Sequence, residues 1–563
     1  MTLLCVPIMV QEIDAALADC AEAKRLGAQI AEYRIDHILS GNPEGSQPDD
    51  PDARRETDEI IRLVRSSPLP CIVTCRPTFE GGHYDGDDAS RISLYERLAT
   101  IDTPPRYIDV EHATISRSAN IRQKVLLAVN HPGQLRGLDT ALILSAHDFQ
   151  RRPADLTRRL LTMRDEPAAK IIKIAYRARS LRDNIELFDI LRHTDRPMIA
   201  LGMGEFGLMS RVLAPKFGAF LTFASLRDAS ATAPGQPTIT EILQRFRFRS
   251  INQETRVYGV LGWPVGHSLS PLIHNAGFEA LGHNGVYLPM PIAAPDGNTD
   301  DNGAYESFKA TLLELIEHDA LDLSGASVTI PYKQALVRLA GEMGESRNWF
   351  LSPSARAIGA ANTIVVQRDL GSPPSRITID NTDAPAIAAC LSHQAGPVAG
   401  RHVVVLGAGG VARAAAYACA AAGANVTVTA RRSQEADALA SAMRRSANLD
   451  IRTMPWESRH EAPADAFINC TPLGMQGGPA PDRSPIEPDA LTNADPSSVV
   501  YFDTVYAPLR TPMLALAQRL GAPTIDGASM FVKQGAMQFR MWTDRPAPED
   551  LFDGLVRARL NAT

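Results

Sequence analysis

The chain has 563 residues, of which 45% are hydrophobic and 21% are charged, and its formal net charge at pH 7 is −7. A chain of this length exceeds one ordinary hydrophobic core, so we expect two or three globular domains. The negative charge offers no basic field for nucleic acid, and no apolar run approaches the roughly 18 residues of a membrane span. The composition therefore indicates a soluble globular protein that binds neither nucleic acid nor membranes.

The N-terminus and the cysteines indicate the cellular compartment. An apolar run at 3–10 has no basic residues before it and is followed by Glu12 and Asp14, so we expect no secretory signal. The seven cysteines are odd in number and spread along the chain, which is typical of reduced thiols in a cytoplasm. Cys71 and Cys75 share one predicted strand, where buried packing is a better interpretation than a metal pair. We expect no metal site.

The first half of the chain alternates apolar strands with helical stretches. The predicted strands lie at 3–9, 29–35, 71–76, 107–111, 141–146, 171–176, 198–201 and 219–223. Eight strand–helix units in about 240 residues are typical of a (β/α)8 barrel, with an open doubly wound sheet as the alternative. We expect this barrel domain to span residues 1–246, and the mostly polar run at 247–256 predicts a linker to a second α/β domain.

A lysine interrupts the sixth predicted strand. Lys173 lies in the sequence Ile-Ile-Lys-Ile-Ala, and period-two alternation puts it with Ile171 and Ala175 on the face that points into the barrel. Burial disfavours the charged form of an amine, and a neutral amine attacks ketones. The sequence therefore predicts an amine nucleophile, with a lysine tied to a structural carboxylate as the alternative.

Other polar side chains fall on the inward faces of neighbouring strands. They are Glu32, Arg34 and Asp36 on the second strand, Thr74 and Arg76 on the third, and Ser145 and His147 on the fifth. Arg211 follows the seventh strand, and the segment 232–236 follows the eighth. Because barrel active sites lie at the carboxyl ends of the strands, these cations predict a pocket for a carboxylate there.

Four motifs contain these residues. They are Glu32-x-Arg34-x-Asp36, Ser145-Ala146-His147-Asp148-Phe149, Ile172-Lys173-Ile174 and Ala233-Pro234-Gly235-Gln236. In this order and at this spacing they resemble the type I 3-dehydroquinate dehydratases, over nearly all of residues 1–245. The resemblance implies a lyase that converts 3-dehydroquinate to 3-dehydroshikimate through a Schiff base. Thr232 departs from the family pattern, which usually has serine there.

The resemblance also implies a role for each residue. Lys173 forms the imine with the substrate ketone, His147 moves protons, and Glu80 orients His147. Arg211 binds the substrate carboxylate. The hydroxyls and the ring of the substrate are held by Glu32, Arg34, Arg76, Thr232 and Gln236.

The second half opens with a strand at 258–261 and four short polar motifs. They are Ser268-Leu-Ser270-Pro271, Ser327-Val-Thr329-Ile-Pro331-Tyr-Lys333, Gly359-Ala-Ala-Asn362-Thr363 and Asp380-Asn381-Thr382-Asp383. Two serines two apart can aim their hydroxyls at one carboxylate while the proline stiffens their loop. Taken singly, each motif is an ordinary turn or a solvated surface charge.

A dinucleotide site is predicted where an apolar strand runs into a glycine turn and an alanine-rich helix at 404–414. Gly407, Gly409 and Ala412 fit the G-x-G-x-x-G/A pattern, in which the glycines make the turn and let the backbone approach a pyrophosphate. The alternative is an ordinary glycine turn.

The next strand, at 425–429, indicates which dinucleotide is bound. It ends in Ala430-Arg431-Arg432, where an NAD site would carry an acidic residue for the ribose 2′-hydroxyl. Guanidinium groups instead pair with a 2′-phosphate, so NADP is the cofactor that we expect. A solvated basic pair at a strand end is the alternative.

Together with this turn, the polar motifs resemble the shikimate dehydrogenases over residues 257–563. The resemblance implies that Lys333 and Asp383 form the catalytic pair. Shikimate is then bound by Ser268, Ser270, Thr329, Asn362, Asp383 and Gln534, with Tyr506 beside it. NADP is bound by Gly407, Ala408, Gly409, Gly410, Val411, Ala430, Arg431 and Arg432, together with Thr471 and Gly527. Three positions depart from the family pattern, namely Ser327, Ala384 and Ala430.

The second resemblance also implies how the domains divide. A shikimate-binding α/β domain is expected at 257–383, completed by helices at about 529–560, and a Rossmann-type NADP domain at 384–528. The two activities are consecutive, and their order resembles that of the bifunctional shikimate-pathway enzymes of plants. No transit peptide precedes the barrel, so we expect a cytoplasmic, microbial version. Monomer and homodimer both stay open.

Three alternatives stay open for the function. The second half could oxidise quinate with NAD, although Ser268, Thr329 and Arg431 argue against it. The barrel could be a Schiff-base aldolase, which the Glu-x-Arg-x-Asp context disfavours. One half could be a scaffold that binds metabolites without catalysis, which the retention of Lys173, Lys333 and His147 argues against.

Overall fold

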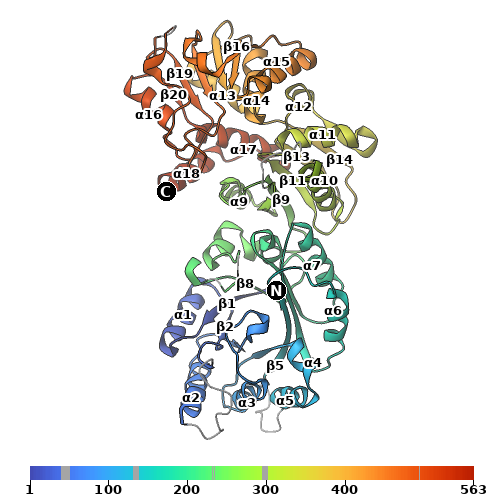
Figure 1. Cartoon of the computed structure of the whole chain (residues 1–563). Coiled ribbons are helices and arrows are strands. Elements are labelled where there is room, and N and C mark those ends of the chain that lie inside the picture. Colours follow the sequence, from blue (N-terminus) through green and yellow to red (C-terminus); the bar gives the residue numbers. More distant parts are fainter. Residues whose placement is uncertain are drawn as a thin grey trace. The chain divides into compact units, whose positions relative to one another are not determined.

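The computed structural model describes residues 1–39, 51–130, 139–230, 232–233, 235–294, 302–492 and 495–562. The motif residue Pro234 therefore lies outside the described residues. The chain divides into two units, Met1–Thr255 and Arg256–Thr563 (Figure 1). Each unit is described by itself below.

Eight parallel strands form the sheet of the first unit. They are β1 (Leu3–Met9), β2 (Ile30–Arg34), β3 (Cys71–Thr74), β4 (Tyr107–Glu111), β5 (Ala141–Asp148), β6 (Ala169–Arg177), β7 (Met198–Met203) and β8 (Leu221–Phe223). Their order is β7-β6-β5-β4-β3-β2-β1-β8. The two ends of the sheet meet, because Phe220 N donates to Met198 O at 2.8 Å. The predicted (β/α)8 barrel is confirmed, and the open doubly wound sheet is wrong.

Helices surround the barrel, as Figure 1 shows in blue to green. They are α1 (Ile13–Leu26), α2 (Pro51–Arg65), α3 (Asp88–Ala99), α4 (His112–Arg117), α5 (Ala119–Val129), α6 (Leu156–Arg164), α7 (Arg182–Arg192) and α8 (Leu208–Val212). The interior holds a cluster of buried apolar residues that includes Ile30, Ile72, Ile143, Ile171 and Ala175. Because Ile171 and Ala175 flank Lys173 at period two, this cluster shows that the lysine faces the barrel interior.

The run predicted to be a linker packs against the barrel. Phe248 and Ile251 are buried, and the Lys216 ammonium donates to Gln253 O at 2.9 Å and Thr255 O at 2.8 Å. Arg249 Nη2 donates to Gly27 O at 2.7 Å. Although most residues of this segment are polar, these two apolar side chains hold it against the barrel. The first unit therefore extends to Thr255.

The second unit begins with a mixed sheet. Its strands are β9 (Arg256–Gly262), β10 (Gly285–Pro291), β11 (Leu323–Val328), β12 (Trp349–Leu351), β13 (Thr363–Gln367) and β14 (Arg376–Asp380), in the order β10-β9-β11-β13-β14-β12. β13 is antiparallel to both of its neighbours, and the other pairs are parallel. The accompanying helices are α9 (Ser270–Ala280), α10 (Asn302–Glu317), α11 (Lys333–Met343) and α12 (Pro353–Ile358).

A second sheet is wholly parallel and has the order β17-β16-β15-β18-β19-β20. Its strands are β15 (His402–Leu406), β16 (Asn425–Ala430), β17 (Arg452–Pro455), β18 (Ala466–Asn469), β19 (Val500–Asp503) and β20 (Thr524–Ile525). The helices that go with it are α13 (Asp383–Ala395), α14 (Gly410–Ala421), α15 (Ser433–Ala447) and α16 (Pro512–Arg519). This is the predicted Rossmann-type arrangement.

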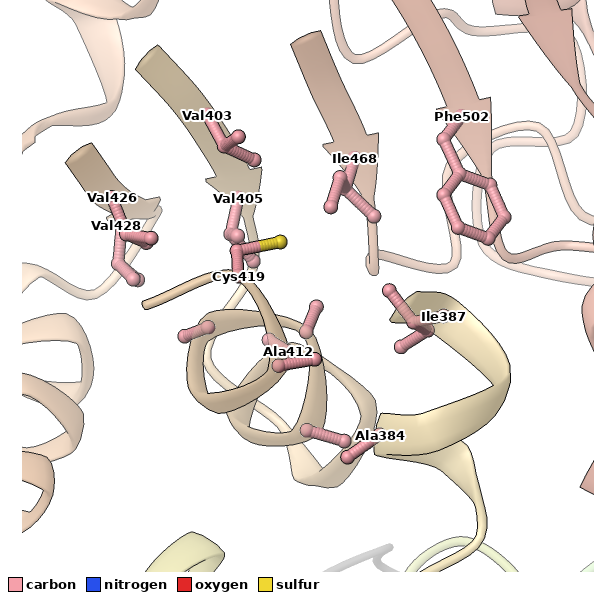
Figure 2. Close-up of a cluster of buried hydrophobic side chains, with 14 of the residues drawn as sticks. Ala384, Ile387, Val403, Val405, Ala412, Cys419, Val426, Val428, Ile468 and Phe502 are labelled. Carbon is pink, nitrogen blue, oxygen red and sulfur yellow. The ribbon is translucent and has the colours of Figure 1, made fainter. Parts of the chain in front are cut away.

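Small side chains let α14 pack closely on this sheet. Figure 2 shows Val403, Val405 and Ile468 of the strands facing Ala412 and Cys419 of α14. Ala412 and Ala414–Ala416 of α14 are fully buried, and small residues here allow a helix to approach a strand closely. The packing fixes the N-terminus of α14 beside the glycine turn.

The C-terminal helices α17 (Gly527–Thr543) and α18 (Glu549–Asn561) return to the mixed sheet. Trp542 Nε1 donates to Ile364 O at 2.9 Å, and Gln538 Nε2 donates to Asn362 O at 3.0 Å. The end of the chain thus lies against the sheet that carries the polar motifs. Among the described residues, no helix is both long enough and apolar enough to cross a membrane.

Candidate active sites

The buried lysine of the barrel lies between two carboxylates. Lys173 Nζ is 2.9 Å from Asp109 Oδ2 and 3.3 Å from Glu32 Oε1, and it lies over the Phe223 ring. The lysine is therefore in contact with two carboxylates, Asp109 on β4 and Glu32 on β2.

The imidazole predicted to move protons is oriented by a carboxyl group. Glu80 Oε2 accepts from the His147 backbone N–H at 3.1 Å and lies 3.0 Å from His147 Nδ1, which is the contact that the resemblance predicts. Burial, and then the charges of Arg76 and Lys173, hold the pKa of His147 well below its usual range. The ring is neutral at pH 7, and with Nδ1 engaged, Nε2 is the nitrogen left to act as a base.

Arg76 is engaged on all sides by protein groups. Its guanidinium contacts Asp109 Oδ1 at 2.9 Å, Glu111 Oε1 at 2.8 Å and Ser145 Oγ at 2.8 Å. Burial alone would lower the pKa of Arg76, but Asp109 and Glu111 raise it. Burial alone would likewise raise the pKa of Asp109, yet Arg76 and Lys173 lower it. Arg76 is therefore held in place by the two carboxylates of β4.

Asp109 and Glu111 are site residues that the sequence reasoning missed. Both lie on β4 and are fully buried. They are two apart in the sequence Asp109-Val-Glu111, so the same alternation that selected Glu32 and Arg34 could have selected them. Glu111 also accepts from the buried Arg91 at 2.7 Å.

Two predicted ligand contacts are already used within the barrel. Arg34 donates to both oxygens of Asp36, at 2.9 and 3.0 Å. Glu32 Oε1 accepts from Thr74 Oγ1 at 2.8 Å in addition to its contact with Lys173. The first pair fixes the orientation of the guanidinium, and the second fixes that of the carboxylate.

Two predicted donors have atoms that lack a hydrogen-bond partner among the described residues. Arg211 is 1% exposed, yet among the described residues its Nε and Nη2 make no hydrogen bond. Desolvation lowers the pKa of Arg211 to about 10. Gln236 Oε1 accepts from the Thr232 amide at 3.1 Å and from its hydroxyl at 3.2 Å, while Gln236 Nε2 is buried without a partner in the described structure. Orphaned buried donors are costly unless a ligand satisfies them.

The second unit holds its own lysine–carboxylate pair. Lys333 Nζ lies 2.6 Å from Asp383 Oδ2, and both side chains are buried. Lys333 begins α11 and Asp383 begins α13, which brings residues 50 positions apart together. Asn362 Nδ2 donates to the other oxygen of Asp383 at 3.0 Å. The amide therefore holds the carboxylate in position beside the ammonium.

The remaining predicted substrate residues lie around this pair or at the adjoining strand ends. Asn362 Nδ2 is 3.4 Å from Gln534 Oε1. The Ser270 amide donates to Ser268 Oγ at 3.2 Å, at the start of α9. Thr329 follows β11, and the Tyr506 ring lies 5.0 Å from the ring of Phe531 of α17, at a tilt of 38°. Burial raises the pKa of Tyr506.

The departure at Ser327 has a structural reason. Its hydroxyl donates to Gln538 Oε1 at 2.8 Å and accepts from Tyr287 at 2.7 Å. Gln538 Nε2 in turn donates to Thr363 Oγ1 at 3.0 Å as well as to the Asn362 carbonyl. A short hydroxyl at this position thus completes a buried network under Asn362.

The glycine turn after β15 has the features of a dinucleotide site. Gly407 has a φ of 115°, which favours glycine, and a Cβ there would lie 3.0 Å from Cys470 O. A Cβ at Gly409 would meet nothing within 4 Å, so the backbone at Gly409 is open. A Cβ at Gly410 would lie 3.0 Å from Lys333 Cδ. Ala408 and Val411 are half-buried in the same turn. The turn therefore leaves room for a ligand on one side and touches the buried lysine on the other.

The two arginines after β16 differ in their contacts. Arg432 Nη2 pairs with Glu435 Oε1 at 2.6 Å, whereas Arg431 is exposed and makes no hydrogen bond or ion pair in the part of the chain that the structure describes. Ala430 is buried at the strand end. An exposed guanidinium beside the glycine turn fits the 2′-phosphate of NADP.

Thr471 and Gly527 lie near the ends of β18 and β20. Thr471 Oγ1 donates to Asn469 Oδ1 at 2.7 Å. A Cβ at Gly527 would lie 2.4 Å from Val505 O, so only glycine fits this approach. In the described residues, no group of three or more His, Cys, Asp or Glu side chains could hold a metal ion.

The chain matches models of four protein families. The model described as "Type I 3-dehydroquinase" matches residues 4–253, and "Shikimate dehydrogenase substrate binding domain" matches residues 260–364. "Putative NAD(P)-binding" matches residues 396–472, and "Shikimate 5'-dehydrogenase C-terminal domain" matches residues 527–556. The matches follow the same order as the sheets described above.

Curated proteins and a solved structure resemble the chain over one or both units. The chloroplastic bifunctional 3-dehydroquinate dehydratase/shikimate dehydrogenase of Arabidopsis thaliana is 32% identical, over 98% of this chain and 83% of that protein. The shikimate dehydrogenase (NADP(+)) of Citrifermentans bemidjiense is 36% identical, over 55% of this chain and 98% of its own length. The structure of dehydroquinate dehydratase and shikimate dehydrogenase from S. pombe is 24% identical, with a TM-score of 0.40, and covers 99% of this chain and 98% of that chain.

Proposed function

The chain belongs to the family of bifunctional 3-dehydroquinate dehydratase/shikimate dehydrogenases, and on this premise we propose how its residues perform the two reactions. The enzyme dehydrates 3-dehydroquinate to 3-dehydroshikimate and reduces that product to shikimate with NADPH. The observation that carries the residue assignment is that each unit holds its own buried lysine in contact with an aspartate. These pairs are Lys173 with Asp109 and Lys333 with Asp383.

In the dehydratase reaction, Lys173 is the nucleophile. Its ammonium gives a proton to Glu32, and the neutral amine adds to the ketone carbon of 3-dehydroquinate. Glu32 returns this proton to the hydroxyl of the adduct, which leaves as water and forms the protonated imine. The imine withdraws electrons from the adjacent carbon, so that a weak base can remove a proton there. Asp109 and Glu32 balance the positive charge of the imine as they balance that of the ammonium.

His147 moves the proton. Its neutral Nε2 removes the proton from the carbon next to the imine, and the resulting imidazolium protonates the hydroxyl that leaves as water. Glu80 holds the ring through Nδ1 throughout both steps. Water then hydrolyses the imine, which releases 3-dehydroshikimate and returns the Lys173 amine.

The orphaned donors supply substrate binding in the barrel. We assign Arg211 to the substrate carboxylate, because its Nε and Nη2 are buried without a partner among the described residues and a carboxylate can accept from both. Gln236 Nε2, which likewise has no partner in the described structure, is a second donor, for a substrate hydroxyl. The other hydroxyls and the ring of the substrate are assigned to Glu32, Arg34, Arg76 and Thr232.

In the reductase reaction, Lys333 is the acid. The glycine turn at 407–411 and Arg431 would hold NADPH, which would supply the hydride to the carbonyl carbon of 3-dehydroshikimate. As the carbonyl oxygen gains charge, Lys333 Nζ donates a proton to it, and Asp383 and Asn362 keep the ammonium oriented. Oxidation of shikimate runs through the same groups in reverse.

The other second-unit residues bind the two ligands of this reaction. Shikimate lies among Ser268, Ser270, Thr329, Asn362, Gln534 and Tyr506. NADP is held by the glycine turn at 407–411 and by Arg431, with Ala430 and Arg432 at the same strand end and Thr471 and Gly527 on the nicotinamide side. The open backbone at Gly409 and the exposed side chain of Arg431 support this assignment.

The domains and the setting of the enzyme are part of the proposal. We assign residues 1–246 to the dehydratase, 247–256 to the connection, 257–383 with about 529–560 to shikimate binding, and 384–528 to NADP. All seven cysteines are free, which supports a reducing cytoplasm. Gel filtration with light scattering distinguishes a monomer from a homodimer.

A coupled assay tests the proposal. Purified enzyme with 3-dehydroquinate and NADPH should yield shikimate with one NADPH consumed for each. The Lys173→Ala variant should consume NADPH only when 3-dehydroshikimate is supplied. The Lys333→Ala variant should accumulate 3-dehydroshikimate without consuming NADPH. Equal loss of both activities in either folded variant would contradict the assignment. Equal rates with quinate and NAD would favour a quinate dehydrogenase instead.

A further inference from the structure

A buried carboxylate outside the predicted sites joins two strand ends in the second unit. Asp503 is the last residue of β19, and its neighbour across the sheet is Asn469, the last residue of β18. Both are fully buried. Asn469 Nδ2 donates to Asp503 Oδ1 at 2.9 Å. The carboxyl ends of parallel strands carry the ligand-binding loops in such sheets, so this pair lies where loop geometry matters.

Through Asn469, the carboxylate holds the loop that carries Thr471. Asn469 Oδ1 accepts from the Thr471 amide at 2.9 Å and from its hydroxyl at 2.7 Å. Asn469 Nδ2 also donates to Leu473 O at 3.2 Å. The amide of Asn469 can point its oxygen toward Thr471 only while its nitrogen has acceptors on the other side. Of the two acceptors, Leu473 O and the Asp503 carboxylate, only the carboxylate can carry a charge.

The same carboxylate directly holds the loop that carries Tyr506. The Val505 amide donates to Asp503 Oδ1 at 3.0 Å, and Thr511 Oγ1 donates to Asp503 Oδ2 at 2.7 Å. These two contacts lie on either side of Tyr506 in the sequence. Thr511 is also the N-cap of α16, so the loop is fixed at both ends. Gln476 N donates to Ala507 O at 2.8 Å and joins the two loops to each other.

We propose that Asp503 is a positioning residue for the shikimate dehydrogenase reaction, which sets the loops of Thr471 and Tyr506 against each other around the reacting ligands. This inference rests on the proposed function, which assigns Thr471 to the nicotinamide side and Tyr506 to shikimate. Asp503 touches neither ligand and acts through Asn469, Val505 and Thr511.

The charge state of Asp503 matters for this role, because a carboxylate accepts hydrogen bonds with both oxygens. Burial raises the pKa of Asp503 to about 7, although hydrogen bonds from Thr511, Val505 and Asn469 favour the ionised form. No cation among the described residues forms an ion pair with it. The titratable group facing it is the Cys470 thiol, whose pKa is raised by burial and then by the Asp503 charge. As the pH falls below about 7, Asp503 gains a proton and one acceptor position is lost.

The test uses Asp503→Asn in the full chain, because asparagine keeps the size and presents an NH2 group where an acceptor is needed. We expect the KM values for shikimate and NADP+ to rise and kcat/KM to fall by about tenfold. Shikimate dehydrogenase activity of the wild type should rise as the pH is raised through 7, and this rise should be smaller in the variant. Dehydratase activity of the same preparation should be unchanged, and a circular dichroism spectrum and melting curve that match those of the wild type report that the second unit is folded. Thr511→Val should also raise the KM values and lower kcat/KM, but by a smaller factor than Asp503→Asn.

A matched control is available on the same strand. Tyr501 is fully buried on β19, and its hydroxyl donates to Pro496 O at 3.2 Å, away from the two loops. Tyr501→Phe should leave both KM values and the pH profile unchanged. The inference is overturned if Asp503→Asn keeps wild-type KM values and pH profile, or if Tyr501→Phe changes them equally. A wild-type enzyme without shikimate oxidation would instead contradict the proposed function.

Discussion

Lys333 packs against Gly410, the first residue of α14. A Cβ built on Gly410 would lie 3.0 Å from Lys333 Cδ and 3.1 Å from Lys333 Cβ. Gly410, the third glycine of the turn, therefore leaves space for the Lys333 side chain as well as for a dinucleotide. The contact places the proposed acid directly against the helix that begins the NADP site.

Gly410→Ala should move the Lys333 side chain and lower shikimate oxidation. We expect kcat to fall by about tenfold, because a displacement of the acid misaligns proton transfer. Gly341→Ala is the control, since Gly341 lies on the same helix as Lys333 and a Cβ there meets nothing within 4 Å. Steady-state kinetics of both variants check this. An equal effect of the two substitutions would show that the contact with Lys333 is not the cause.

Arg211→Leu should separate ligand binding from stability. The buried guanidinium has no partner for Nε and Nη2 in the described structure, so its removal relieves a desolvation cost in the ligand-free protein. We expect the melting temperature without ligand to stay level or rise. The KM for 3-dehydroquinate should increase by about 100-fold, because a charge-assisted contact to the substrate is lost. A lower melting temperature with an unchanged KM would assign Arg211 a structural role.

Glu80→Gln should retain most dehydratase activity at pH 7. Burial raises the pKa of Glu80 to about 8, so the neutral form dominates below that pH and a glutamine has the same shape and charge. The amide oxygen can still accept from the His147 amide and Nδ1. We expect a rate within about threefold of wild type at pH 7 and a loss of the pH dependence near 8. Glu80→Ala, which leaves His147 unsupported, should lose more than tenfold. A pH–rate profile from pH 6 to 9 decides between neutral and ionised Glu80.

His274→Leu should make the second unit less sensitive to acid. The imidazole lies in an aromatic cluster with Tyr287, Phe539 and Trp542, and neither nitrogen has a partner among the described residues. Burial lowers the pKa of His274 to about 3. Below about pH 6.5 the unfolded chain therefore binds a proton that the folded chain does not bind. The free energy of unfolding falls by about 1.4 kcal/mol for each unit by which the pH is lowered from about 6.5 to about 3.

Thermal unfolding between pH 7 and 5, followed by residual shikimate dehydrogenase activity, measures this slope. The slope should be smaller in His274→Leu than in wild type. His393→Leu provides the control, because His393 is an exposed histidine on α13 and the substitution removes no buried imidazole. Identical slopes in all three proteins would show that His274 is not the source of the acid sensitivity.

Much of the barrel could be predicted from the sequence, because eight apolar strands alternate with helical stretches. The alternation of residues along the sixth strand also predicts that Lys173 points into the barrel. Asp109 and Glu111 carried the same signal on β4 and were missed, because acidic residues at a strand end also suit solvent. The contact between Lys333 and Asp383 spans 50 residues and follows from no local pattern. It was predicted only from the resemblance of the motifs to a known family.

The structure was needed for contacts that join distant strand ends. The link between Asn469 and Asp503 depends on the register of β18 and β19, which the sequence does not reveal. The burial of Phe248 and Ile251 was masked by the polar residues around them. The roles of Ser327 and Gly410 likewise depend on which side chains the fold brings within reach.

Reduction with borohydride in the presence of 3-dehydroquinate, followed by mass mapping of the peptides, tests the central claim most directly. If Lys173 forms the imine, the peptide that contains it should gain the mass of the reduced adduct, and Lys333 should stay unmodified. An unmodified Lys173 peptide in an enzyme that still dehydrates the substrate would contradict the account.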